Sequence, residues 1–459
     1  MLGYVTIGIF AVIVLITAFF RGKALLYLYA IGLPFFGIIA EIGLQVTPFL
    51  VVSVGMLLHI AMKRESLQLP KALMPFILYA IFFTFIMSFF LPDEVYNYPP
   101  LRGRYRWVAQ LAVFTLLVTP IFFVLSIRVD RKLLFNVINC FLTVVFCISL
   151  TGIIQMIIYR LTGTDIFPFN MFSNEIVEDK LKSALAAISM QEKVLRMTGL
   201  GAGEPKHFGF TCAIAFILNL LMSLVIPPHG IRKKVWRFIM AVIFFVCVLL
   251  SLSTQAYFVL GISISMLTLI LLFRYGFKSK RFLLLNSLLI AGAVTLFSNN
   301  YTRRLVELRI FERLEDTGAV EDFNQTIYSF LADNTRFLAL GTGMGNVHLW
   351  AGDYIPKEFR YYMRNNIFVA KAGFLRILSE LGIVGLILYY GGFLVLFWRI
   401  FQSLRKNYFP EGEIVLVFLV IVITNNLVTA DSAPYHIFAL AMAYLFLQTT
   451  KTSNHEAIS

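Results

Sequence analysis

Long apolar stretches separated by short polar connections run through almost the whole chain. A membrane-spanning α-helix needs about 17 to 25 predominantly apolar residues to cross the hydrocarbon core of a bilayer. The pattern predicts thirteen such helices, at 4–20, 24–41, 47–62, 73–91, 107–127, 133–158, 208–226, 236–253, 255–273, 282–298, 380–398, 413–428 and 434–449. Residues 24–62 contain Pro34 and Pro48 and are short for two full spans. In an alternative count of twelve, one segment there is re-entrant or tilted.

The predicted spans follow one another without a linker rich in Ser, Gly or Pro. We therefore expect an all-α polytopic membrane protein that forms a single transmembrane domain over residues 1–459. The apolar run from Tyr4 to Phe20 lacks a basic segment before it and an Ala-x-Ala cleavage site. It is expected to be a retained helix rather than a signal peptide.

The orientation follows from the short connections, because cytoplasmic loops of membrane proteins are enriched in Lys and Arg. Alternating helices place five basic connections on one side, around Lys63, Arg128, Arg232, Arg274 and Arg399. This side is predicted to be cytoplasmic. Three larger connections, 92–106, 159–207 and 299–371, then form external loops. We expect the largest of them to contain short amphipathic helices at the membrane surface.

The composition agrees with a membrane protein, since 59% of the residues are hydrophobic, 14% are charged and the mean hydropathy is +0.82. A soluble domain usually has about 25% charged residues. The net charge of +14 favours lipid phosphates and an anionic lipid-linked substrate as partners over nucleic acid. The four cysteines lie in apolar stretches without a CxxC pair, which indicates buried free thiols.

Signatures of several common enzyme classes are absent from the sequence. It has no GxxxxGK[ST] phosphate loop, no HExxH and no GxSxG, which argues against an ATP-driven pump or an intramembrane metalloprotease. The outer loops are rich in Arg and Lys but poor in acidic clusters, so we expect neither a metal nor a cofactor. Residues 341–346 are predicted to form a tight turn, whose amides are candidates for a small anion-binding concavity.

Two segments carry a more specific pattern. The first contains Arg196 and Gly199 and runs directly into a predicted helix. The second begins with the turn at 341–346 and continues to Glu380-Leu-Gly382-Ile-Val-Gly385. Together with the helix count and the large outer loop, these motifs resemble the superfamily of O-antigen ligases and O-antigen or exopolysaccharide polymerases. In that family an Arg-x-x-Gly stretch, a Gly-x-Gly turn and a Glu-x-Gly-x-x-Gly signature occur in the same order.

The resemblance implies a metal-independent, GT-C-like glycosyltransferase of the bacterial inner membrane, with its large loop facing outward. Its donor would be a glycan linked to undecaprenyl pyrophosphate, and its acceptor a hydroxyl of another glycan or of a lipid-linked glycan. A chain-length regulator and a flippase are further implied partners. Because pyrophosphate is a good leaving group, such a protein mainly binds it, neutralises its developing charge and positions the acceptor.

The chain departs from the family pattern at two places. Lys371 and Ala372 stand where the family has a functional His followed by Asn, and Ser253-Thr254-Gln255 lacks the Arg of a Ser-Arg pair. These departures favour a polymerase over a ligase that transfers glycan to the lipid A core. The sequence leaves both acceptors open.

The predicted substrate-binding residues are cationic, because Arg and Lys bind phosphate oxygens. Arg196 occupies the family's Arg position. Lys206 and His207 lie at the start of the next helix, where the positive end of the helix dipole favours an anion. Each of the three has a structural alternative as a residue that marks the membrane interface. We expect Arg196 and Lys371 to converge on one external pocket that binds the donor pyrophosphate.

Lys371 and His348 are the candidate catalytic residues. Lys371 is predicted to bind phosphate, or to accept a proton if neighbouring arginines favour its neutral form. His348 is the only His of the large loop and the candidate base, with a surface His without a role as its alternative. Arg336, Arg364 and Arg376 complete the predicted substrate-binding set. An intrahelical ion pair with Glu380, four residues away, is the alternative for Arg376.

Two other classes of function stay open at this point. A transporter such as a lipid-linked oligosaccharide flippase would have inverted halves and paired broken helices, which are not visible in the sequence. A continuous cationic cavity at the bilayer centre would favour it. A scaffold of an envelope-synthesis complex would have no closed pocket beside the large loop.

Overall fold

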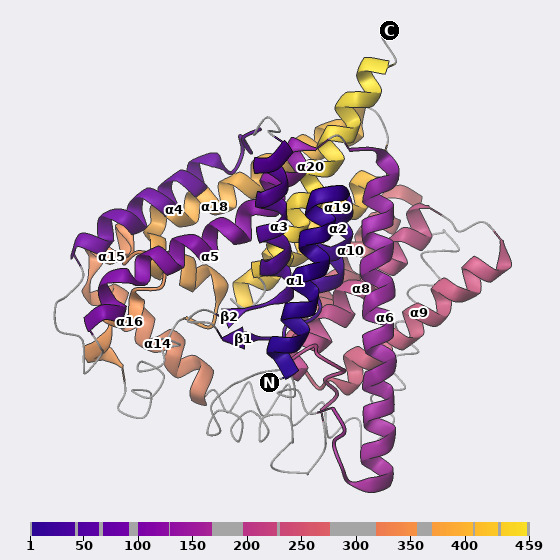
Figure 1. The fold of residues 1–459 in the computed structure, drawn as a ribbon, viewed down its shortest axis with the longest axis horizontal. Helices are drawn as coiled ribbons and strands as arrows, with labels where there is room; N and C mark the ends of the chain where they lie inside the picture. The colour runs from indigo at the N-terminus through magenta and orange to yellow at the C-terminus, as the bar shows by residue number, and fades with distance from the viewer. Residues whose placement is uncertain are drawn as a thin grey trace. The chain divides into compact units, whose positions relative to one another are not determined.

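The computed structural model describes residues 2–41, 45–63, 68–90, 100–127, 129–167, 196–226, 230–275, 318–355, 370–406, 409–429 and 433–456 (Figure 1). The N-terminal helices are α1 (Leu2–Phe20), α2 (Ala24–Gly32), α3 (Pro48–Lys63), α4 (Met74–Met87), the 3-10 turn η1 (Ser88–Phe90), α5 (Pro100–Ser126) and α6 (Arg131–Thr162). The central helices are α8 (Pro205–Val225), α9 (Ile231–Leu250), α10 (Thr254–Tyr275), α14 (Gly318–Asp333), α15 (Thr335–Leu340), α16 (Val347–Trp350) and the 3-10 turn η3 (Gly352–Tyr354). The C-terminal helices are α18 (Gly373–Lys406), α19 (Pro410–Val428) and α20 (Ala433–Glu456).

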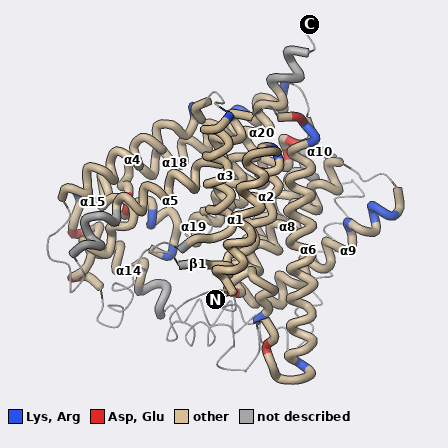
Figure 2. The backbone as a smooth tube through the Cα atoms, in the orientation of Figure 1, with Lys and Arg blue, Asp and Glu red and all other residues tan. Residues whose placement is uncertain are grey.

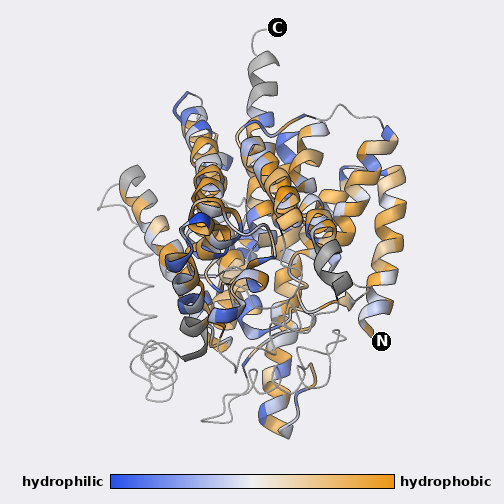
Figure 3. Cartoon of the chain, turned by 90° about the vertical axis from the view of Figure 1, so that its left-hand side faces the viewer, coloured by the Kyte–Doolittle hydropathy of each residue, from blue (hydrophilic) through white to orange (hydrophobic). Residues whose placement is uncertain are grey.

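Six helices of the described residues are long and apolar enough to cross a membrane. They are α1, residues 107–126 of α5, α6, α8, α18 and residues 410–427 of α19. Figure 3 shows hydrophobic colour along much of the helical ribbon, and Figure 2 shows charges mainly near helix ends and connections. Shorter apolar helices lie at 48–63, 74–90 and 254–269. This helical architecture is that of a polytopic membrane protein, as the sequence predicts.

The expectation of a full span over 24–41 is wrong. Helix α2 has only nine residues, so it rises about 13 Å, less than half of the hydrocarbon thickness. Pro34 follows its end and has no N–H to continue the helical hydrogen bonds. The chain then forms a two-residue strand, β1 (Ala40–Glu41), that pairs antiparallel with β2 (Gln45–Val46). The predicted span at 282–298 lies outside the described residues.

The chain divides into two compact units, each built from segments that are distant in sequence. Unit 1 comprises Met1–Gly55, Asp130–Asp316 and Phe409–Ile421, and unit 2 comprises Met56–Val129, Thr317–Tyr408 and Val422–Ser459.

Unit 1 is organised around α8, which packs against α6, α9 and α10. Gly209 permits close packing there, because a Cβ at that position would lie 2.2 Å from the Ser251 hydroxyl oxygen. Helix α6 begins where the Asp130 carboxylate accepts a hydrogen bond from the Leu133 amide at 2.8 Å. Arg131 on its first turn forms an ion pair with the buried Glu411 of α19.

Unit 2 contains α4, α5, α18 and α20, with α18 packed against α4 and α20 against α5 (Figure 1). The segment 318–355, called the helical insert below, contributes α14, α15, α16 and η3. The insert has its own core, in which Phe330 stacks on Phe337 and Phe337 contacts Trp350. Short helices therefore occur within the predicted large loop. The position of this loop outside the membrane stays a prediction.

Candidate functional site

A cavity of about 240 Å³ lies within unit 2, between α4, α5, α18, the C-terminal part of α19, and α20. Most of its wall is apolar, with Phe76 of α4, Phe114 of α5 and Leu440 of α20 among the lining residues. The polar lining residues are Gln110, Arg376, Glu380, Tyr389, Asn426 and His436. The cavity is thus amphipathic, with an ionic pair at one part of its wall.

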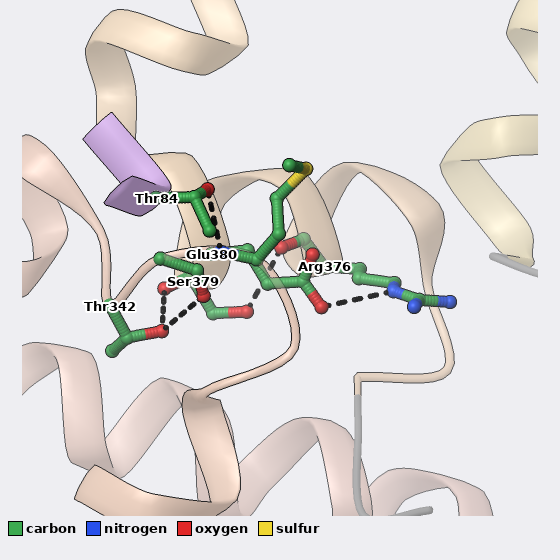
Figure 4. A network of polar contacts seen from close by, with 7 residues as sticks. Thr84, Thr342, Arg376, Ser379 and Glu380 are labelled. Atoms are coloured by element: carbon green, nitrogen blue, oxygen red, sulfur yellow. Dashed lines mark hydrogen bonds and ion pairs between the residues drawn. The ribbon is translucent and has the colours of Figure 1, made fainter. Parts of the chain in front are cut away.

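A break in α18 determines how the ionic pair faces the cavity. Gly382 has φ 67° and ψ −174°, so the helical hydrogen-bond pattern is interrupted at this residue. The glycine turn, residues Gly341–Asn346, supplies replacement donors (Figure 4). The Thr342 amide donates to the Ser379 carbonyl at 3.0 Å and the Gly343 amide to the Glu380 carbonyl at 2.8 Å. The Thr342 hydroxyl also donates to the Ser379 carbonyl, at 3.0 Å.

Two glycines make this contact possible. A Cβ at Gly341, which has φ 90°, would lie 2.4 Å from the Glu380 carbonyl oxygen, and one at Gly382 would lie 2.3 Å from that of Ala339. Both distances are far below van der Waals contact, so only glycine allows the two backbones to meet. A positive φ also favours glycine at both positions.

The amides of the glycine turn are bonded to protein oxygens. Besides Thr342 and Gly343, the Met344 amide donates to the Thr84 hydroxyl at 3.2 Å and the Asn346 amide to the Gly343 carbonyl at 3.2 Å. These four amides are therefore unavailable to an anion, and the hypothesis of an anion-binding concavity formed by them is wrong. The prediction of a tight turn is confirmed.

Arg376 and Glu380 form the intrahelical ion pair that their spacing predicts. The Arg376 Nε lies 3.2 Å from the Glu380 Oε1, with side chains 38% and 10% exposed. Both residues line the cavity (Figure 4 shows the pair). The guanidinium of Arg376 is the counter-ion of this little-exposed carboxylate.

The aromatic part of the cavity wall contains two further side-chain hydrogen bonds. The Tyr389 hydroxyl lies 2.6 Å from the His436 Nδ1, and the Tyr390 hydroxyl donates to the Asn426 Oδ1 at 2.7 Å. Phe76 packs edge-on against Tyr389, with ring centroids 5.0 Å apart. These contacts fix the positions of α18, α19 and α20 around the cavity.

Sequence reasoning missed most of the polar lining. Gln110, Tyr389, Asn426 and His436 all lie inside predicted membrane spans. Polar side chains within such spans are rare and usually face a cavity or a protein neighbour. Their presence is the signal in the sequence that points to an intramembrane site.

Among the predicted residues of unit 2 that the structure describes, only Arg376 lines this cavity. The Lys371 ammonium lies 4.6 Å from the centre of the Phe323 ring, and its amide donates to the Asn324 Oδ1 at 3.0 Å. His348 is completely buried within the helical insert. Arg336 is stacked over Phe337, 4.6 Å from the ring centre. Arg364 lies outside the described residues.

The helical insert also contains a perturbed tyrosine. The Tyr354 hydroxyl donates a hydrogen bond to the Asp333 Oδ2 at 3.0 Å. Partial burial and this bond to a carboxylate raise the pKa of Tyr354. The Tyr354 hydroxyl is thus a donor that joins α14 to η3.

The predicted residues of unit 1 lie on the segment before α8 and on its first turn. Arg196 is buried, and its Nε donates to the Ser251 carbonyl at 3.3 Å. The Lys206 Nζ lies 3.2 Å from Glu204, and the His207 ring stacks on Phe36 with centroids 4.9 Å apart. Because Arg196 belongs to unit 1 and Lys371 to unit 2, their convergence on one pocket stays a prediction.

Gln155 of α6 holds the segment that carries Arg196. Its side-chain oxygen accepts hydrogen bonds from the amides of Thr198 and Gly199, at 3.2 and 3.3 Å. Its nitrogen donates to Asp165 at 2.8 Å and to the Phe167 carbonyl at 3.0 Å. Gln155 is fully buried, so these bonds are shielded from water.

Within the described parts of the chain, no group of three or more His, Cys, Asp or Glu side chains is arranged to hold a metal ion. In comparisons with protein-family models and with curated proteins, the sequence has no match. The class that fold and site define is a helical membrane protein with an amphipathic cavity, walled by apolar side chains and carrying one Arg–Glu pair.

Proposed function

We propose that the protein is a membrane glycosyltransferase that polymerises oligosaccharide repeat units linked to undecaprenyl pyrophosphate. The cavity of unit 2 is the observation that carries the proposal. Its apolar wall is of a kind that accommodates a polyprenyl chain or another lipid. Arg376 and Glu380 place charged groups in the wall of the same cavity. The order of the Arg-x-x-Gly, Gly-x-Gly and Glu-x-Gly-x-x-Gly motifs, described above, supports the same class of enzyme.

The reaction requires the protein mainly to position the two substrates and to neutralise the charge of the leaving pyrophosphate. The pyrophosphate leaves the anomeric carbon with the bonding electrons, so cations must neutralise the negative charge that develops on it. The guanidinium of Arg376 suits this role because its planar donors match phosphate oxygens. Arg196 is retained as a proposed pyrophosphate ligand, and Lys206 and His207 as further proposed ligands, on the basis of the family resemblance.

The acceptor distinguishes polymerase from ligase. Deleting the gene and separating the surface glycan on a gel tests the proposal directly. A polymerase predicts that the glycan shortens to single repeat units, whereas a ligase predicts that no glycan is attached to the lipid A core. Unchanged glycan in the deletion strain would contradict both.

We expect Arg376→Ala to lower the rate of glycan polymerisation on the order of 10²-fold at saturating donor, because a charge-stabilising contact in the transition state is lost. Arg376→Lys is expected to be intermediate, since it keeps the charge but loses the planar donor pair. The rate is measured with purified protein in proteoliposomes. The matched control is Arg399→Ala, an exposed arginine of the same helix outside the cavity lining. Equal rates for the two alanine variants would exclude a role of Arg376 in the reaction.

The proposed orientation places the helical insert on the external side. In a variant whose native cysteines are replaced, Asp353→Cys is therefore expected to react in intact cells with a membrane-impermeant thiol reagent. Asp353 is exposed, so the reaction of a cysteine there depends on the side of the membrane on which it lies and not on burial. The control is Lys233→Cys, an exposed position in a predicted cytoplasmic connection, which should react only after permeabilisation. The reverse pattern would invert the proposed topology.

A further inference from the structure

We infer that Glu380 is the general base that accepts the proton of the acceptor hydroxyl, an inference that rests on the proposed function. Glu380 is the only carboxylate among the described residues that line the cavity. Its side chain is 10% exposed, so the carboxylate is largely withdrawn from water yet reaches the cavity wall. A carboxylate in a mostly apolar cavity is a strong candidate for proton transfer.

The surroundings of Glu380 hold it in one place. At the end of the side chain, Oε1 accepts a hydrogen bond from the Arg376 Nε at 3.2 Å. On the backbone end, its carbonyl accepts the Gly343 amide at 2.8 Å, and that of the preceding Ser379 accepts the Thr342 amide at 3.0 Å (Figure 4). The glycine turn therefore anchors the residue just before the break at Gly382. A base that is held at both its side chain and its backbone is already positioned for proton transfer, so little reorganisation is needed during the reaction.

The two residues that the sequence offered as bases are engaged elsewhere. His348 is fully buried in the helical insert and does not line the cavity. The Lys371 ammonium lies over the Phe323 ring, in a cation–π contact, and does not line the cavity. Glu380, by contrast, lines the cavity in which the acceptor would bind.

The proposed step is balanced in atoms and charge. The acceptor oxygen forms a bond to the anomeric carbon of the donor while the bond from this carbon to the pyrophosphate oxygen breaks. The bonding electrons leave with the polyprenyl pyrophosphate, which Arg376 helps to neutralise. The proton of the acceptor hydroxyl moves to the Glu380 carboxylate and is later released to water.

Three variants in proteoliposomes test this role with a synthetic polyprenyl-pyrophosphate-linked oligosaccharide as donor. Glu380→Gln keeps an oxygen for the Arg376 Nε but cannot take up a proton, so kcat should fall on the order of 10²- to 10⁴-fold with donor binding retained. Glu380→Ala should be equally slow, and added formate should restore part of its rate, because a small carboxylate can replace the missing one. Glu413→Gln, a helix glutamate outside the cavity lining, should keep the wild-type rate.

The outcomes separate this inference from the proposed function. If the wild-type protein elongates no lipid-linked glycan, the proposed function fails and the role of Glu380 with it. If the wild-type protein is active and either Glu380 variant keeps its rate, only the base assignment is wrong. Loss of donor binding in both variants, or an inactive Glu380→Ala that formate does not restore, would also overturn the assignment, since Glu380 would then bind substrate or support the fold. Slow variants that bind donor, with formate rescue, support it.

Discussion

Gly382→Ala is expected to destabilise the protein by about 3 kcal/mol or more and to remove its activity. The backbone at Gly382, with φ 67° and ψ −174°, lies in a region that is essentially restricted to glycine and costs other residues about 1 to 3 kcal/mol. The added Cβ would also lie 2.3 Å from the Ala339 carbonyl oxygen and 2.5 Å from the Leu340 carbonyl carbon. Because both are backbone atoms at the end of α15, α15 and the glycine turn that follows it must move away from α18.

The separation should displace Glu380, whose carbonyl is bonded to the turn. The thermal unfolding midpoint in detergent and the rate of glycan polymerisation measure the two effects. Gly391→Ala is the matched control on the same helix, because a Cβ there would have nothing within 4 Å. It should be neutral or stabilising by up to about 1 kcal/mol, as alanine is the better helix former. A Gly382→Ala variant that melts with the wild type would show that the break in α18 is not needed.

The long helices of this fold are predictable because each corresponds to an apolar run that is long enough for a membrane-spanning helix. The predicted spans at 4–20, 133–158 and 208–226 correspond to α1, α6 and α8. The extent and continuity of the helices are less predictable: the predicted span 380–398 lies within α18, which runs from Gly373 to Lys406 and is broken at Gly382. Apolar content does not distinguish a continuous helix from a broken one, because a break depends on donors from a distant segment, here the glycine turn.

Part of the candidate site is local in sequence and was predictable. The Arg376–Glu380 pair follows from a spacing of one helical turn. The cavity is not local, since its lining comes from five helices and from Met344 of the glycine turn, and no periodicity specifies how these elements pack. The contact of Lys371 with Phe323 is equally non-local. The sequence alone predicts Lys371 as a phosphate ligand beside a helix start, and its contact with Phe323, 48 positions earlier in the chain, could not be predicted from it.

Gln155→Leu is expected to lower the stability by about 3 kcal/mol and to reduce the rate of glycan polymerisation. Leucine has a similar size but leaves the Thr198 and Gly199 amides without the acceptor that they bind in the buried segment before α8, and an unsatisfied buried donor costs about 1 to 3 kcal/mol. The activity falls because this segment positions Arg196, the proposed pyrophosphate ligand. Thr143→Val is the control on the same helix, since its hydroxyl is exposed and bonds only to the Asn139 carbonyl one turn before it. Thermal unfolding and polymerisation rates of the two variants are compared.

A Gln155→Leu protein with wild-type stability would show that water replaces the lost hydrogen bonds. A Gln155→Leu protein that is destabilised but fully active would remove Arg196 from the proposed site.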